Sequence, residues 1–369
     1  MRIGLITTLG TNIGDDFIRE GICLVLREVF KNKTIEFVPV NKHRPMTIYP
    51  KWHPCRLAES VPYANRYAYA LFGTIFYKAG YTLFDDCDLI VQCGAPVLWP
   101  GCHKAEWAVP LWHQVVGRLH ERIPVLNLAA GSCYPWERQP ANISEPHDAA
   151  YVSAILAYCR LTTSRDTLAQ SLFSSLGGET PHIPCTAFLA AKDFEKHQES
   201  ENLVLINYME GGGHYDWSQD IDKTKWQNII QRFIDCMRKR HRIAFLCHDQ
   251  KEYELAKHVD HSIDRFFPKS SDEYFRVTSK ASAAICNRMH ASVGLAGMGI
   301  PSVAVGTDTR ILMVKTLKLP CHYVKDVSVE LLEDDMEHLI KKAADQRERL
   351  RSLQSETVKA YIDIVSKTL

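Results

Sequence analysis

Short apolar runs alternate with helical patterns along the whole of this chain. In its first half, buried strands are predicted at residues 2–8, 35–40, 89–92 and 124–130. Helical patterns are found at residues 17–30, 107–121, 149–157 and 166–176. Strands that alternate with helices form parallel sheets covered by helices on both faces. The first half is therefore predicted to be an α/β domain.

The same alternation starts again after a charged, hydrophilic stretch at residues 192–202, which we interpret as a linker. Further strands are predicted at 203–208, 242–247, 283–286 and 302–306, and further helices at 225–239, 250–258, 271–280 and, in two patterns, 329–368. A chain of 369 residues exceeds the usual size of one core. We expect two Rossmann-like, doubly wound domains facing a cleft, at residues 1–190 and 200–369.

Composition excludes several functional classes. A formal net charge of +1 argues against a dedicated nucleic-acid binder. The 12 cysteines are scattered singly, which favours reduced thiols and no metal site. The N-terminal apolar run is too short for a signal peptide, and no run of about 18 apolar residues predicts a membrane span. We expect a soluble, cytoplasmic protein.

Residues 42–81 differ from the rest because aromatic side chains are concentrated there. An aromatic amphipathic insertion can contact a membrane surface or a lipid-linked substrate. More often such a segment is a loop and helix packed on its own domain. Both interpretations stay open.

Polar residues follow the predicted strand 283–286, in the turn that leads into an apolar helix. Ligands of open α/β sheets bind at such carboxyl ends of strands. Arg288 offers a forked donor suited to phosphate or carboxylate, and a helix N-terminus disfavours the cationic form of His290. This pairing suits chemistry on an anion. The alternative is a structural salt bridge for Arg288 and a capping role for His290.

Four other turns also follow predicted strands, one of them the small-residue turn at residues 129–132. In the first, Asn12, Gly14 and Asp15 precede a helix, although a carboxylate there can be a simple N-cap. The second contains Gly94, a small residue that lets a ligand approach the backbone. In the last, Asp308 and Arg310 follow the strand 302–306.

Taken in order, these turns resemble the polysaccharide pyruvyl transferase family. The resemblance runs from about residue 3 to about residue 318 and includes the N-x-G-D turn at residues 12–15, the glycine turns at 94 and 131, and S-R-D at 164–166. It is strongest where R-x-H-A at 288–291 precedes G-x-P at 299–301. The sequence departs from the family in a glycine run reduced to residues 93–95 and in Met289, where leucine is usual.

This resemblance implies a GT-B type two-domain fold, with the acceptor on the N-terminal side. It implies transfer of a pyruvyl group from phosphoenolpyruvate to a sugar diol, giving a ketal, with no cofactor besides that donor. Arg288 is the first choice for the anion clamp, and His290 for proton transfer. Arg165 and Arg310 are further anion contacts, but a salt bridge with a carboxylate at the helix start is an equal alternative for Arg165.

Two further groups are candidates for substrate contacts. Gly212 and His214 belong to a glycine cluster after the strand 203–208, which is either a phosphate-binding or a merely flexible loop. Trp99, His103 and Trp107 are acceptor-side candidates because aromatic faces stack on sugars, and the last two have helical i,i+4 spacing. The same residues can instead be part of the core.

The partners expected are thus a small-molecule donor and a glycan or lipid-linked sugar acceptor. Two other functions remain open. One is a nucleotide-sugar-dependent glycosyltransferase, for which Asp308 is available as a ribose contact. The other is a non-catalytic glycan-binding relative, which the reduced glycine run at residues 93–95 leaves open.

Overall fold

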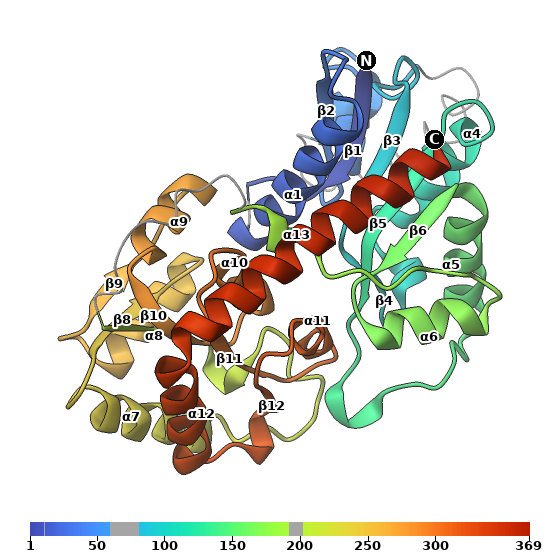
Figure 1. Ribbon diagram of the computed structural model, residues 1–369. Coiled ribbons are helices and arrows are strands. Elements are labelled where there is room, and N and C mark those ends of the chain that lie inside the picture. Colours follow the sequence, from blue (N-terminus) through green and yellow to red (C-terminus); the bar gives the residue numbers. More distant parts are fainter. Residues whose placement is uncertain (11, 60–80, 192–201) are drawn as a thin grey trace.

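The computed structural model describes residues 1–10, 12–59, 81–191 and 202–369, and it contains two parallel sheets. Their strands are those that the apolar runs predict, together with short strands that those runs do not reveal. Most of the aromatic segment 42–81 and nearly all of the predicted linker 192–202 lie outside the described residues. The two sheets belong to two parallel-sheet domains, confirming the predicted fold class (Figure 1).

The N-terminal sheet has the strand order β2-β1-β3-β5-β4, with β6 pairing on β5. Its strands are β1 (Arg2–Thr7), β2 (Glu36–Asn41), β3 (Leu89–Cys93), β4 (Pro96–Leu98), β5 (Val125–Ser132) and β6 (Leu161–Ser164). The helices of this half are α1 (Ile13–Val29), α2 (Pro54–Glu59), α4 (Gly117–Leu119), α5 (Pro146–Tyr158) and α6 (Thr167–Ser175). The helix predicted at 107–121 begins as a π-helical segment, η3 (Ala108–Val116), which leads into α4.

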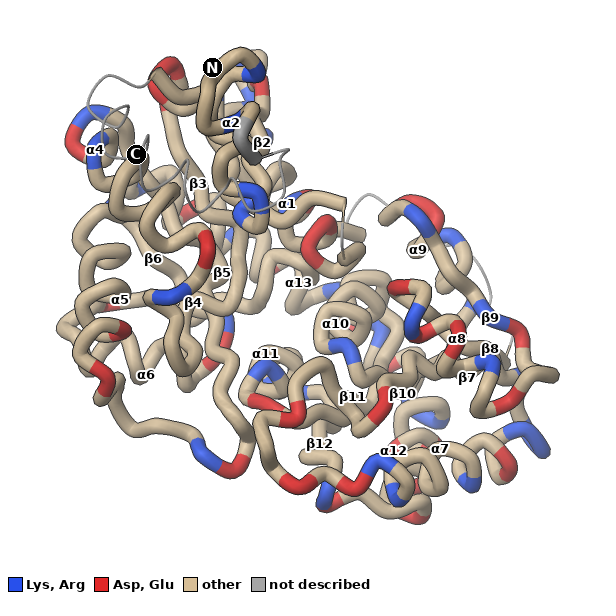
Figure 2. The backbone as a smooth tube through the Cα atoms, turned by 180° about the vertical axis from the view of Figure 1, so that it is seen from behind, with Lys and Arg blue, Asp and Glu red and all other residues tan. Residues whose placement is uncertain are grey.

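The C-terminal sheet has the order β12-β11-β10-β7-β8-β9. Its strands are β7 (Leu203–Asn207), β8 (Arg242–Leu246), β9 (Asp264–Phe266), β10 (Ala281–Cys286), β11 (Ser302–Gly306) and β12 (Cys321–Tyr323). Its helices are α7 (Lys223–Met237), α8 (Gln250–Val259), α9 (Ser271–Thr278), α10 (Met289–Gly297), α11 (Ile311–Thr316), α12 (Val329–Lys341) and α13 (Ala343–Thr368). Lys and Arg are interspersed with Asp and Glu on its outer helices (Figure 2).

An apolar core joins the two domains behind the cleft. Phe17 of α1 stacks edge-on against Tyr274 of α9, with ring centroids 4.8 Å apart. It also packs on α10 at Gly294, where a Cβ atom would lie 2.9 Å from the Phe17 ring. The long helix α13 crosses from the C-terminal domain to the N-terminal one (Figure 1), and its Tyr361 hydroxyl donates to the Pro184 carbonyl. These contacts fix one domain against the other.

Short 3-10 turns complete the described chain: η1 (Pro45–Ile48), η2 (Cys102–Lys104), η4 (Trp136–Arg138), η5 (Thr186–Leu189), η6 (Glu210–Gly212) and η7 (Val324–Asp326). Turns that follow strands of both sheets lie at the cleft between the domains. Among the described residues, no helix is both long enough and apolar enough to cross a membrane.

Candidate active site

A cavity of about 600 Å³ lies between the two domains, within the size range of small-molecule sites. Residues from both domains line it: Asn12, Asp15, Lys42, His43, Pro96, Trp99, Pro100, Trp107, Cys133 and Arg165 from the first, and His214, Tyr215, Trp217, Asp249, Arg288, His290 and Arg310 from the second. Most residues predicted for the site therefore come together, although they are spread over some 300 positions of the sequence.

Arg288 is already paired with two carboxylates. Its Nε donates to Glu252 and its Nη2 to Asp249, and its side chain is only 13% exposed. Glu252 is itself buried and accepts further hydrogen bonds from the Asn207 amide and the His248 backbone. The structural salt bridge considered for Arg288 is thus what the structure contains. Arg288 lines the cavity, but the carboxylates of Asp249 and Glu252 balance its charge.

Arg165 has the opposite environment, since it is fully buried without a carboxylate partner among the described residues. Its Nη1 lies 3.3 Å from His290 Nε2 and 3.7 Å from Cys185 Sγ, while Nε and Nη2 have no hydrogen-bond partner. A glycine gives it room, because a Cβ atom on Gly131 would lie 2.3 Å from Arg165 Nε.

The salt bridge considered for Arg165 at the helix start is not formed in the described chain. The neighbouring Asp166 is used elsewhere: it accepts hydrogen bonds from Ser132 and caps α6 through the Ala169 backbone. The cavity therefore contains a buried guanidinium with unused donors. Such a group is suited to an anionic ligand.

His290 lies at the start of α10 and is neutral. A guanidinium only donates hydrogen bonds, so His290 Nε2 accepts from Arg165 Nη1 and the ring proton sits on Nδ1. Burial, together with the positive charges of Arg165 and Arg310, lowers the pKa of His290 well below its usual value. The capping role considered for His290 is not found, because the N-cap residue is Arg288 and it makes no side-chain cap.

The predicted turn at residues 12–15 supports His290. Asn12 caps α1 by accepting from the Gly14 backbone at 3.0 Å, and both Asn12 and Asp15 line the cavity. Gly14 is needed for packing, since a Cβ atom there would lie 2.6 Å from His290 Cβ. The carboxylate of Asp15 is not the N-cap that was considered.

Arg310 forms a local pair with Asp308. Its Nε and Nη2 lie 2.8 and 2.6 Å from the two carboxylate oxygens. Burial works against the charged form of Arg310, but the attraction of Asp308 outweighs it and the pKa of Arg310 is raised. Asp308 is thus paired with Arg310 through both carboxylate oxygens.

Comparison with known proteins places this site in a family. Residues 12–309 match the family model of polysaccharide pyruvyl transferases. The chain belongs to this family. It is accordingly a transferase, and the resemblance found in the sequence is confirmed. No curated protein matches the chain by sequence.

Solved structures of similar fold are distant in sequence. Staphylococcus aureus MnaA, solved with UDP, is 14% identical with a TM-score of 0.53, and the match covers 96% of this chain and 91% of that one. The UDP-GlcNAc 2-epimerase of Neisseria meningitidis, bound to UDP-GlcNAc, is 10% identical with a TM-score of 0.54, covering 100% and 99%. That of Methanocaldococcus jannaschii is 10% identical with a TM-score of 0.55, covering 92% and 93%. These likenesses show a GT-B fold.

Aromatic side chains form two walls of the transferase's cavity. On the N-terminal side, Trp99 and Trp107 have ring centroids 5.7 Å apart and are half-buried. On the C-terminal side, Tyr215 and Trp217 follow η6, and the guanidinium of Arg310 lies 5.2 Å from the centre of the Tyr215 ring. A flat ligand between these walls would meet aromatic faces from both domains.

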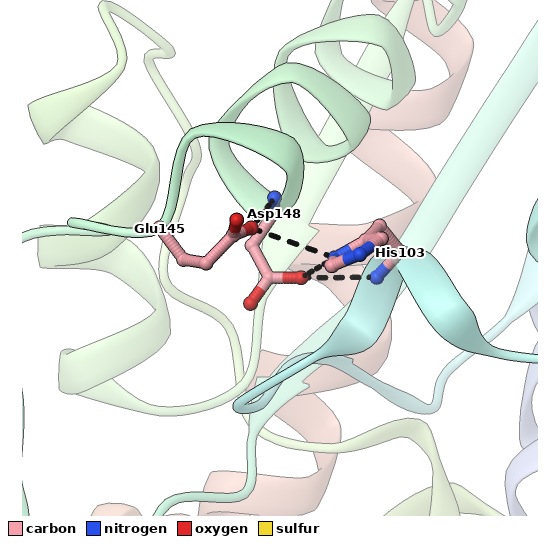
Figure 3. A group of neighbouring side chains, drawn as sticks. All are labelled: His103, Glu145 and Asp148. Atoms are coloured by element: carbon pink, nitrogen blue, oxygen red, sulfur yellow. Dashed lines mark hydrogen bonds and ion pairs between the residues drawn. The ribbon is translucent and has the colours of Figure 1, made fainter.

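His103 does not line the cavity of the transferase. Its Nδ1 lies 2.5 Å from Asp148 and 3.5 Å from Glu145 (Figure 3). The three groups have metal-ligand chemistry, but their oxygens already accept backbone hydrogen bonds: Asp148 from Gly101 and His103, and Glu145 from Asp148. The cluster ties η2 to α5. The prediction that His103 and Trp107 lie one turn apart on the same helix is also wrong, since η2 ends at Lys104 and η3 begins at Ala108.

Two predicted glycines serve packing in the transferase. A Cβ atom on Gly94 would lie 2.9 Å from the Ala129 carbonyl, and one on Gly212 would lie 2.5 Å from Val324. Neither residue lines the cavity. His214 does line it, next to Arg288 and Arg310.

The sequence analysis missed several residues of the cavity, among them Lys42, His43, Cys133 and Asp249. Lys42 directly follows β2 at the carboxyl end of that strand, the position used above to find the other turns. We assigned residue 42 to the aromatic segment and did not treat it as a site residue. The strand-end rule, applied to all strands alike, would have found it.

Proposed function

We propose that this transferase moves the pyruvyl group of phosphoenolpyruvate onto two hydroxyls of a sugar in a polysaccharide or glycan precursor, forming a pyruvate ketal and releasing phosphate. One observation carries this proposal within the family: a buried guanidinium with unused donors, Arg165, touches a neutral histidine in a cleft between two domains. An anion bound by Arg165 and a proton transferred by His290 would therefore lie next to each other.

Arg165 is the better donor clamp, in place of Arg288. The donor carries a phosphate and a carboxylate, and the planar fork of an unpaired arginine binds either in bidentate fashion. The charge of Arg288 is already balanced by Asp249 and Glu252, whereas Arg165 contacts only neutral groups.

His290 moves the proton of the first addition. The neutral Nε2 accepts the proton of one sugar hydroxyl as its oxygen bonds to C2 of the enol, and the imidazolium delivers that proton to C3, which becomes a methyl group. The second hydroxyl then bonds to C2 while the C2–O bond to phosphate breaks, and its proton leaves on the phosphate. Arg165 releases the Nε2 lone pair of His290 when it turns to the donor.

The acceptor occupies the space between the aromatic walls. Sugar rings stack on such faces, and the cavity is lined by Trp99 and Trp107 from the N-terminal domain and by Tyr215 and Trp217 from the C-terminal domain. A precursor that is still being assembled, free or lipid-linked, supplies the diol in the cytoplasm. Contact with a membrane surface would then come through the acceptor. No cofactor besides the donor takes part.

The test is to mix purified protein with phosphoenolpyruvate and a panel of glycan precursors and to follow phosphate. Phosphate release that depends on the acceptor, with a product heavier by a pyruvate ketal in mass spectrometry, is the expected result. Release of a nucleoside diphosphate from a sugar nucleotide would instead indicate the glycosyltransferase alternative, whose fold the UDP-binding neighbours share. If neither product forms, the remaining alternative is a non-catalytic glycan-binding protein.

A further inference from the structure

Lys42 is held rigidly at the edge of the cavity. Its backbone N–H donates to the Thr7 carbonyl at 2.8 Å, so the turn after β2 is tied to the end of β1. Asn41 strengthens this tie by donating to the Leu9 carbonyl and accepting from the His43 backbone. Lys42 itself is 6% exposed and lines the cavity that contains Arg165 and His290.

The ammonium group of Lys42 has no ion pair or hydrogen bond within the described part of the chain. Its Nζ lies 4.9 Å from the centre of the Trp107 ring, and that ring is held in turn by an edge-on contact with His43. Burial lowers the pKa of Lys42, and the charge of Arg165 adds to this, while Asp15 opposes it. An unpaired ammonium costs stability here, so its presence requires a ligand or a structural reason.

The cations of the cavity divide into two kinds. Arg288 and Arg310 are each paired with carboxylates, as described above. Among the described residues that line the cavity, Arg165 and Lys42 are the cations that no salt bridge engages. Both line the same cavity as His290, and Arg165 contacts His290 directly.

We propose that Lys42 binds the second anionic group of the donor while Arg165 binds the first. The inference rests on the proposed function and deepens it, because phosphoenolpyruvate has two separate anionic groups and one guanidinium fork satisfies one of them. Arg165 and Lys42, the two cavity cations that no salt bridge engages among the described residues, then match the phosphate and the carboxylate of the donor. Because the ammonium group of Lys42 lies over the Trp107 ring, Lys42 also places the donor next to the space proposed for the acceptor.

The experiment measures phosphoenolpyruvate binding directly by calorimetry, without an acceptor, in the wild-type protein and in Lys42→Met. The variant keeps an unbranched side chain of nearly the same length and removes its charge. Loss of one charged contact should raise the Kd about 10- to 100-fold. Lys31→Met is the matched control, since Lys31 is exposed beyond the end of α1 that is remote from the cavity, and its Kd should equal that of the wild type.

Thermal unfolding separates binding from folding. Without ligand, Lys42→Met should melt at the same temperature as the wild type or higher, because a buried charge is gone. A lower melting temperature would assign Lys42 a structural role and overturn the inference. An unchanged Kd for the donor, or a change confined to the acceptor KM, would overturn it while leaving the proposed function intact. A wild-type protein that does not bind phosphoenolpyruvate would refute both.

Discussion

Replacement of Arg165 by methionine should stabilise the protein and abolish its binding of the donor. The residue is fully buried, and its Nε and Nη2 have no hydrogen-bond partner among the described residues, so the folded state bears most of the cost of desolvating this charge. Methionine retains much of the side-chain volume and needs no hydrogen bonds. A residue kept for folding would behave in the opposite way.

The size of the effect follows from the contacts. An unpaired buried charge costs several kcal/mol, and the bonds from Nη1 to His290 and Cys185 recover part of this. We expect Arg165→Met to gain about 1–3 kcal/mol in free energy of unfolding, or about 2–10 °C in Tm for a domain of this size. Phosphoenolpyruvate at about 100 times its Kd should stabilise the wild type by about 2.7 kcal/mol and the variant by nothing.

The assay is thermal unfolding of both proteins with and without phosphoenolpyruvate. The control is Arg118→Met in the same domain, because Arg118 forms two 2.7 Å hydrogen bonds to Asp85. Burial of Asp85 is outweighed by the bonds from Arg118 and Thr82, which bring its pKa to about 2, so this variant should lose stability. If Arg165→Met melts below the wild type in the absence of ligand, or still gains stability from the donor, the argument for an anion site at Arg165 is refuted.

Other variants test the remaining groups of the site. His290→Asn should lower kcat by about 10²–10⁴ while the calorimetric Kd for phosphoenolpyruvate changes little. Arg288→Met should lower the free energy of unfolding by about 3–5 kcal/mol in urea, because Glu252 is left as an unpaired buried carboxylate, and Glu252→Gln in the same chain should restore part of the loss. Burial and Arg288 hold the pKa of His248 well below its usual value, so the unfolded chain binds the proton first and stability falls as the pH drops below about 6.5. His248→Phe should remove up to about 1.4 kcal/mol per pH unit from that slope, measured by urea unfolding from pH 5 to 6.5.

The fold was predictable because the period of the hydrophobic pattern and the length of each apolar segment distinguish strands from helices. The predicted strand 302–306 coincides with β11, and the two helical patterns at the C-terminus correspond to α12 and α13. The strands that were missed are short: β4, β9 and β12 each have 3 residues and β6 has 4, too few for a period. Their formation depends on neighbouring strands that supply hydrogen bonds, which is tertiary information.

The site was predictable in place but not in the roles of its arginines. The strand-end rule located Arg288 and His290, which do line the cavity. It could not show that Arg288 is neutralised, because its partners lie 36 and 39 positions earlier in the chain, on and before α8. It also could not show that Arg165 lacks a carboxylate, since Asp166 is adjacent in sequence but is used by Ser132.

The proposed chemistry depends on keeping the two domains together. Arg165 comes from the N-terminal domain and His290 from the C-terminal domain, yet their nitrogen atoms are 3.3 Å apart. Gly14 of α1 packs directly against His290, so a shift of one domain by even a side-chain width would break both contacts. The apolar core around Phe17 therefore contributes to the proposed catalysis as well as to stability, because it fixes the distance between the guanidinium of one domain and the histidine of the other, whose pKa is lowered by burial and by that guanidinium.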